Sequence, residues 1–129
     1  MRARSIAVAA IILLSAGLTA APAGAAGSAP ATTSSVTTFS GSNCPSNSLC
    51  LYRDYGYTGG GIALNAGDSV PWLGDYGFND KMSAWSNDSG VTCTWTEDAY
   101  GAGISHEMYN GYRIEVLPRE NDMASAVYC

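Results

Sequence analysis

The sequence predicts an all-β domain, a sandwich of two Greek-key motifs. One observation is an internal repeat, because the frame Asn-Asp-x-x-Ser-Ala begins at Asn79 and again at Asn121, 42 residues further on. A second is a series of short β-prone runs separated by Gly-, Asn- and Asp-rich turns. The third is the presence of four cysteines, which predict that disulfides staple this small domain. A repeat at this distance indicates two copies of one supersecondary unit.

The N-terminus has the pattern of a secretory signal peptide. Arg2 and Arg4 precede an apolar run over residues 6–20, and small residues follow at Ala23-Gly24-Ala25. This order of charged, apolar and small residues is typical of a signal peptide with an A-x-A cleavage site, so we expect residues 1–25 to be removed and the mature protein to be secreted and extracellular. The apolar run is too short for a stable membrane span, and no other run of about 18 apolar residues follows.

The next segment, residues 26–43, consists mainly of Ala, Gly, Ser, Thr and Pro and predicts a flexible tail. The folded domain is then expected to span residues 44–129, with Greek key 1 at about 44–88 and Greek key 2 at about 89–129. A chain of this length supports one domain with a modest core, and we expect a monomer.

The four cysteines indicate two disulfides in an exported chain, for which three pairings exist. Cys44 and Cys50 are six residues apart, and a bridge between them would clip the start of the first strand. Cys93 would then pair with Cys129 and close a loop of 36 residues, which is worth about 3 kcal/mol or more in the chain-entropy model. A zinc site is disfavoured because no C-x-x-C pair occurs and the chain has a single His.

The chain is acidic, with a formal net charge of −5 at pH 7. Loss of Arg2 and Arg4 with the signal peptide would bring this to −7. An acidic surface repels phosphate backbones, which argues against nucleic acid as a partner. It favours solubility, cation binding or a basic partner.

Short runs in each half predict the strands of the two Greek keys. The first half has β-prone runs at residues 49–52, 62–64, 70–73 and 82–85, and the second at 91–95, 104–108, 112–117 and 125–128. Pro71 confines the third run to a sheet edge or a strand start. The only competing interpretation is a short helical turn over residues 74–78. In the second half, Asn110-Gly111 predicts a type I′ hairpin turn.

A second repeat concerns the first hairpin of each half. The pattern Tyr52-x4-Tyr57-x-Gly59 is matched 43 residues further on by Trp95-x4-Tyr100, with the glycine of the second copy displaced by one. In each copy an aromatic ring is expected to pack over a folded hairpin whose glycine adopts positive φ. Trp85 and Trp95 are expected in the core, not on a carbohydrate-binding surface, because a small domain needs large apolar side chains.

These paired motifs resemble the Greek-key pair of the βγ-crystallins. More specifically, residues 44–85, with Cys-Pro-Ser-x-x-x-Cys-Leu-Tyr and the run LGDYGFND at 73–80, resemble the secreted actinobacterial peptidase inhibitor family I36, which shares that fold. The resemblance covers nearly all of residues 44–129 and is more specific in the first half. It implies a βγ-crystallin-like fold and a secreted inhibitor, chiefly of metalloproteases, that blocks the active site of a secreted protease.

The repeated motif also resembles the Ca²⁺ sites of βγ-crystallins, in which two loops lie side by side and each helps to build both sites. Here the first Asn-Asp loop is residues 79–83 and the second Asn-Asp loop is residues 121–125. The resemblance implies six ligand residues: Asn79, Asp80, Ser83, Asn121, Asp122 and Ser125. About one carboxylate from each loop predicts weak binding, on the order of 10⁻⁵ to 10⁻³ M. Ala84 and Ala126 replace the final Ser of the family pattern, and a metal-free turn capped by its own side chains is the alternative.

An inhibitor needs a rigid exposed segment, and two segments qualify. They are the loop between Cys44 and Cys50 and the hairpin at residues 97–103, although no residue in either identifies an inhibitory bond. The alternative function is a Ca²⁺-binding structural or stress module without inhibitory activity, and a third is a small secreted toxin on the same fold. An enzyme is not expected, because His106-Glu107 lacks the second His of H-E-x-x-H and no Gly-x-Ser-x-Gly occurs.

Overall fold

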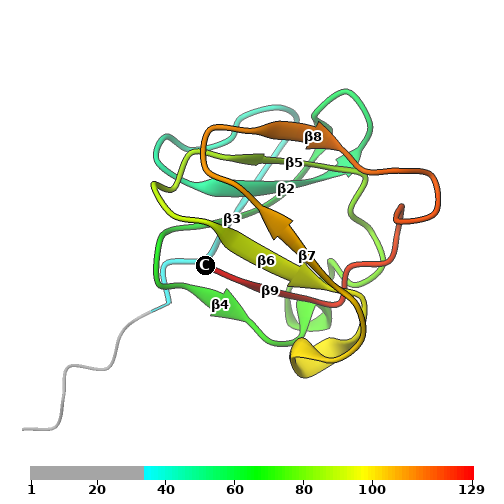
Figure 1. Cartoon of the computed structure of the whole chain (residues 1–129). Coiled ribbons are helices and arrows are strands. Elements are labelled where there is room, and N and C mark those ends of the chain that lie inside the picture. The colour runs from blue at the N-terminus through cyan, green and yellow to red at the C-terminus, as the bar shows by residue number, and fades with distance from the viewer. Residues whose placement is uncertain (1–33) are drawn as a thin grey trace, which may run out of the picture. The chain divides into compact units, whose positions relative to one another are not determined.

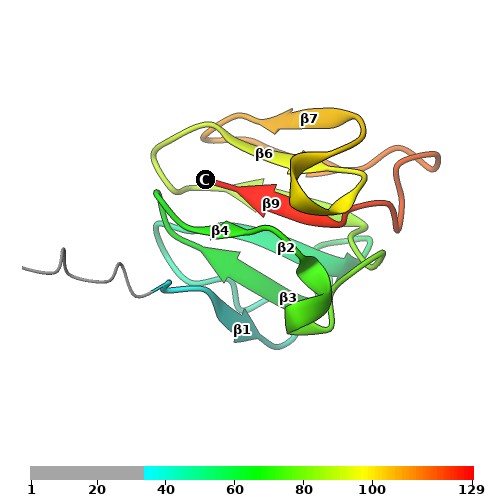
Figure 2. The ribbon, with the colours of Figure 1, turned by 90° about the horizontal axis from the view of Figure 1, so that it is seen from below.

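A computed structural model describes residues 34–129, in which two antiparallel sheets pack as two layers (Figures 1 and 2). The expected signal peptide at residues 1–25 lies outside the described residues. The five-stranded sheet has the order β1 (Thr37–Phe39), β3 (Thr58–Leu64), β2 (Leu49–Asp54), β5 (Ala84–Asn87) and β8 (Arg113–Glu115). The four-stranded sheet has the order β4 (Ser69–Val70), β9 (Ala126–Tyr128), β6 (Cys93–Thr96) and β7 (Ser105–Met108). The architecture is therefore the predicted all-β sandwich.

Each half of the chain contributes one strand to the sheet of the other half. Strand β4, from the first half, pairs with β9, and strand β8, from the second half, pairs with β5. This exchange is the long return connection of a Greek key, and it ties the two halves into one core.

The exchange contradicts the predicted hairpin at Asn110-Gly111, because β7 and β8 lie in different sheets. Only Gly111 has positive φ there, whereas a type I′ turn requires it at both central residues. Asn110 Oδ1 instead accepts a hydrogen bond from Gly90 N at 2.8 Å, and Gly111 N donates to Asn87 O at 2.7 Å. Asn110-Gly111 therefore lies in the connection that leads from β7 in one sheet to β8 in the other.

The domain begins before Cys44, so the predicted boundary at residue 43 is wrong. Strand β1 pairs with β3 along the edge of the five-stranded sheet, from Thr37 opposite Ala63 to Phe39 opposite Gly61. Composition alone did not predict this strand because it has one large apolar residue, Phe39, whose ring packs edge-on to Tyr52 at 5.2 Å.

Two short 3₁₀ helices complete the structure, η1 (Leu73–Tyr76) and η2 (Ala99–Gly101). Helix η1 confirms the helical turn that competed with a strand, since β4 ends at Val70, directly before Pro71. Gly77 closes η1 in the left-handed conformation, at φ 61°. No helix among residues 34–129 has both the length and the apolar content to cross a bilayer.

The main core lies between the two sheets and includes the Cys93–Cys129 disulfide, whereas the Cys44–Cys50 disulfide packs in a separate, smaller cluster. Trp85 and Trp95 are 5% and 1% exposed, which confirms that both are core residues. The disulfides join Cys44 to Cys50 and Cys93 to Cys129, the pairing expected from the sequence. The remaining large apolar side chains that are fully buried come from both halves: Leu49, Leu51, Ile62, Leu64, Val70, Leu73, Phe78, Met82, Met108 and Val127.

The two hairpins, β2–β3 and β6–β7, correspond with an offset of 44 residues, not 43. Leu51 pairs with Ile62, and Trp95 pairs with His106, both 44 residues further on. Positive φ angles recur at the same offset: Gly56, Tyr57 and Gly59 in the first hairpin, and Tyr100, Gly101 and Gly103 in the second. The glycine is therefore not displaced. At this offset Tyr100 corresponds to Gly56, and Gly101 corresponds to Tyr57, so the tyrosine is the residue that differs in position between the two hairpins.

Candidate functional site

The two Asn-Asp loops lie side by side and are joined by reciprocal backbone hydrogen bonds. Asp80 N donates to Ala124 O at 3.0 Å, and Asp122 N donates to Met82 O at 3.1 Å. Both aspartates adopt the left-handed conformation, with φ 53° and 59°. Asp tolerates this region better than most residues because its short side chain forms local hydrogen bonds. The repeat in sequence is thus a repeat in backbone conformation.

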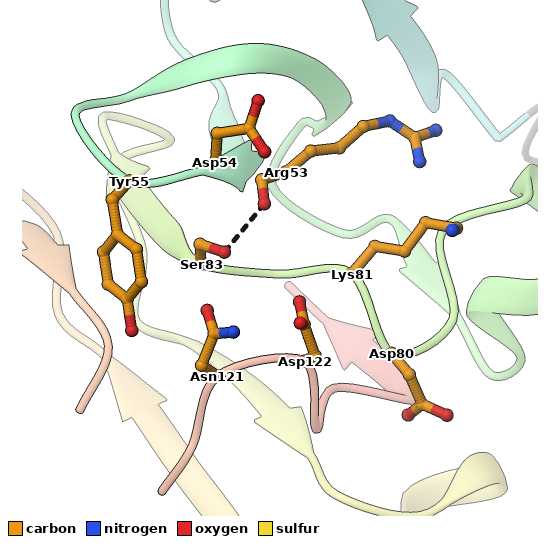
Figure 3. A pocket seen from close by; sticks show the side chains of 8 residues that line it. All are labelled: Arg53, Asp54, Tyr55, Asp80, Lys81, Ser83, Asn121 and Asp122. Atoms are coloured by element: carbon orange, nitrogen blue, oxygen red, sulfur yellow. Dashed lines mark hydrogen bonds between the residues drawn. The ribbon is translucent and has the colours of Figure 1, made fainter. Parts of the chain in front are cut away.

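An open cleft of about 660 Å³ borders the paired loops (Figure 3). Asn121 and Asp122 project toward Ser83, whereas the Asp80 carboxylate points away from them. The serine of the first loop therefore faces the Asn-Asp pair of the second loop. The full lining is Arg53, Asp54, Tyr55, Asp80, Lys81, Ser83, Asn121 and Asp122.

Four of the six predicted ligand residues line this cleft, and Asn79 and Ser125 do not. Asn79 Nδ2 donates to Asp80 Oδ2 at 2.8 Å, which holds that carboxylate within its own loop. Ser125 is 7% exposed. The arrangement brings together donors from both loops but does not gather all six side chains around one point.

Two buried amide oxygens lack a hydrogen-bond partner within residues 34–129, Asn79 Oδ1 and Asn121 Oδ1. They occupy the same position in each loop, and an unsatisfied buried acceptor costs about 1–3 kcal/mol. Ser83 Oγ donates to Arg53 O at 2.7 Å and keeps its lone pairs for another donor or a cation. Oxygen atoms of this kind fit Ca²⁺, a hard cation.

The cleft also contains groups that oppose a cation. Arg53 and Lys81 carry positive charge at its wall. Within the described residues, no group of three or more His, Cys, Asp or Glu side chains is placed to hold a metal ion. Any site here would depend on neutral oxygens and few carboxylates, as the low affinity predicted from the sequence requires.

The predicted ligand set does not include the other half of the cleft lining, namely Arg53, Asp54, Tyr55 and Lys81. Arg53 and Asp54 are the last residues of β2 and Tyr55 follows them, so the β2–β3 hairpin places all three beside the Asn-Asp loops. Arg53 is held there, with its guanidinium 5.1 Å from the centre of the Phe78 ring. Lys81 lies inside the first Asn-Asp loop, so its place in the repeated motif could have indicated that it lines the cleft.

The two candidate inhibitory segments differ in what they present to solvent. The disulfide loop exposes the polar or small residues Pro45, Ser46 and Asn47. The hairpin at residues 97–103 exposes the ring of Tyr100, which is 76% accessible.

A separate apolar groove of about 320 Å³ lies beside β7 and β8. His106 forms part of its wall, and its ring stacks on Trp95 with 3.9 Å between the ring centroids. His106 Nε2 also lies 3.0 Å from Glu97 Oε1. Tyr109 lines the same groove, and its hydrogen bond to the Glu107 carboxylate, together with the negative charge of that group, raises the pKa of Tyr109 above its usual value.

Solved structures similar to this one show the fold. One, from a study of the evolution of the eye lens βγ-crystallin domain fold, has a TM-score of 0.63 and 18% identity, and the match covers 73% of this chain and 95% of that one. Another, a βγ-crystallin from Ciona intestinalis, has a TM-score of 0.54 and 25% identity, with 63% and 96% covered. The chain therefore has a βγ-crystallin fold.

A search of curated proteins gave no match. The family model described as peptidase inhibitor family I36 matches residues 37–107. The matched region begins at β1 and includes the first Greek key, the first Asn-Asp loop and the β6–β7 hairpin. Because it covers more than half of the chain, the protein belongs to peptidase inhibitor family I36.

Proposed function

We propose that the protein is a secreted inhibitor of metallopeptidases that blocks the active site of its target sterically. The observation that carries this proposal is the family match over residues 37–107. Family membership makes the chain a peptidase inhibitor and not an enzyme, and it implies a peptidase as partner. The metallopeptidase class follows from the best-known activity of the family.

The stapled fold supports steric blocking. A binding segment that is already ordered loses little conformational entropy in the complex. The Cys93–Cys129 bridge fixes the start of β6, the strand that leads into the exposed hairpin, to residue 129. A tight inhibitor of this kind needs no chemical step of its own.

Two disulfides also support export, because such bonds persist in oxidising compartments. We expect protein recovered from the medium of a secreting host to begin near Ala26. N-terminal sequencing or intact mass measures this directly. Recovery only from the cytoplasm, with residues 1–25 still attached, would contradict secretion.

Residual peptidase activity tests the proposed inhibition. The purified protein is added at tenfold molar excess to a thermolysin-like metallopeptidase and to a subtilisin-like serine peptidase, each with a fluorogenic peptide. We expect dose-dependent inhibition of the metallopeptidase. The same protein after reduction and alkylation is the matched control and should inhibit far less. Unchanged activity of both enzymes would refute the proposed function.

A second candidate function is weak Ca²⁺ binding at the paired loops, which the two unpartnered Asn oxygens favour. Ser83, Asn121 and Asp122 would hold one ion, and Asn79, Asp80 and Ser125 the other. Calcium would supply positive charge that satisfies these oxygens and fixes the two loops together. This role is compatible with inhibition, since the cation would stabilise the scaffold.

Thermal unfolding in calcium and in chelator tests this site. A ligand that binds only the native state raises its stability, by about 2.7 kcal/mol at 100 times Kd. We expect several millimolar Ca²⁺ to raise the Tm, and the double variant Asp80→Asn/Asp122→Asn to remove the increase. Asp88→Asn, an exposed acid outside the loops, is the control and should keep it. Equal Tm values in calcium and chelator would rule the site out.

A further inference from the structure

The most exposed large apolar side chains of the described residues lie on one hairpin. They are Tyr100, which is 76% accessible, and Ile104, which is 62% accessible. Both belong to the β6–β7 hairpin, which projects at one end of the molecule as the yellow segment near η2 in Figure 1. Large side chains exposed in this way provide no core packing.

Tyr100 has a backbone conformation that suits glycine better than tyrosine. Its φ is 60°, in the left-handed region. At the corresponding place in the first hairpin the chain has Gly56, with φ 72°, and a Cβ built there meets no atom within 4 Å. Tyrosine at this place is therefore strained, and its side chain points into open space. Folding alone favours glycine here.

The ring of Tyr100 does not offset this strain through packing. None of the aromatic pairs within residues 34–129 includes Tyr100. Tyr57, in the first hairpin, contrasts with it: its ring lies edge-on to Tyr52 at 5.6 Å and under the Arg113 guanidinium at 4.1 Å.

The backbone around Tyr100 is nevertheless held in place. Tyr100 N donates to Pro71 O at 2.7 Å, which ties the tip of the hairpin to the segment after β4. Thr96 Oγ1 donates to Asp98 O at 2.7 Å. At the base, Glu97 N donates to Ile104 O at 3.0 Å. An exposed ring on a fixed backbone is preorganised for binding.

The edge of this hairpin is also open. In the first half, β1 covers the outer edge of β3, whereas within residues 34–129 β7 pairs only with β6. A partner can thus approach Tyr100 without displacing a strand.

We propose that Tyr100 is the anchor of the inhibitor, the side chain that enters an apolar substrate pocket of the target peptidase. This inference rests on the proposed function and selects the β6–β7 hairpin over the Cys44–Cys50 loop. The target is then a peptidase whose pocket accepts an aromatic side chain. Aromatic residues buried at the centre of an interface carry much of its binding energy, and the strain at Tyr100 is retained for this contact.

The variant Tyr100→Gly tests the anchor, because it places in the second hairpin the residue that the first hairpin has. It should fold with an unchanged or raised Tm, yet raise the inhibition constant by about 30-fold or more. Tyr100→Phe should inhibit like the wild type, since the ring and not the hydroxyl fills the pocket. Tyr112→Ala, which removes another exposed ring, should also leave inhibition unchanged.

The outcomes separate the two proposals. If the wild-type protein inhibits the thermolysin-like enzyme and Tyr100→Gly inhibits it equally, the anchor is wrong and the proposed function stands. If the wild type inhibits neither peptidase, both fail. If sedimentation shows that Tyr100→Gly loses self-association while its inhibition is unchanged, the ring serves contact between copies of the chain and the anchor is overturned.

Discussion

The β2–β3 and β6–β7 hairpins carry the same three positive-φ positions, 44 residues apart, yet they use them in different ways. In the first hairpin the tyrosine at the middle position packs against the sheet, and β1 covers the outer edge. In the second hairpin the tyrosine has moved by one position and lies in solvent. The same backbone turn thus serves packing in one half and exposure in the other. The repeat in sequence therefore predicts the backbone conformation of the turn, but not whether its tyrosine packs against the sheet or lies in solvent.

Removal of a disulfide gives the largest single expected loss of stability, and the loss should differ between the two halves. Cys93–Cys129 closes a loop of 36 residues and Cys44–Cys50 a loop of six. The chain-entropy model assigns about 4 kcal/mol to the first and about 2 kcal/mol to the second. We expect Cys93→Ala/Cys129→Ala to be the more destabilised pair in urea unfolding. Equal losses would show that loop length does not set these contributions.

A substitution at Gly60 should displace β1, the strand that pairs with the outer edge of the first hairpin. The φ of Gly60 is 71°, and an added Cβ would lie 2.5 Å from Phe39 O in β1. Gly60→Ala should therefore push β1 away and cost about 3 kcal/mol. Its counterpart Ile104 has no covering strand within the described residues, so Ile104→Ala should change stability by less than about 1 kcal/mol. Denaturant midpoints compare the two, and a neutral Gly60→Ala would mean that β1 contributes little.

Exchanging the tyrosines for glycine should have opposite effects on stability. Tyr57→Gly removes the contacts with Tyr52 and Arg113 and should cost about 2 kcal/mol, after relief of the left-handed strain. Tyr100→Gly removes strain and little packing, so it should lie within about 1 kcal/mol of the wild type, on the stabilising side. Chemical unfolding of both variants measures this. If Tyr100→Gly loses as much stability as Tyr57→Gly, the Tyr100 ring makes packing contacts with the rest of the domain.

The smallest expected effect concerns the segment that leads into β1. Partial burial acts to raise the pKa of Asp68, but hydrogen bonds from Ser35 Oγ, Asn65 N and Ser35 N outweigh it and lower the pKa below its usual value. A lowered pKa adds stability above the unfolded value of about 3.9, and that stability is lost as the pH falls through the folded value.

We expect Asp68→Asn to reduce stability slightly at pH 7 and to match the wild type more closely near pH 3. Urea unfolding at both pH values tests this. Asp88→Asn, an exposed acid, is the control and should not change the pH dependence in the same way. A constant difference between wild type and Asp68→Asn would contradict the pKa shift.

Local patterns in the amino-acid sequence were enough to predict the turns, the two Greek keys and the disulfide pairing. The repeated Asn-Asp frame and the glycine-rich turns predicted two Greek keys, and the spacing of Cys44 and Cys50 favoured the disulfide pairing that the structure has. Three of the six predicted ligand residues, Ser83, Asn121 and Asp122, face one another in the cleft. These features persist because turn conformation and cysteine spacing depend on neighbours along the chain.

Strand pairing and side-chain exposure, by contrast, depend on contacts between segments that are far apart in the sequence. The exchange of β4 and β8 made Asn110-Gly111 a connection between sheets, and β1 joined the domain through backbone hydrogen bonds that composition does not encode. The hairpin register moved Tyr100 from the position of Tyr57 to that of Gly56. Both tyrosines lie in the turn and not in a paired strand, so whether the ring packs or lies in solvent depends on which turn position the residue occupies and on the strands around it.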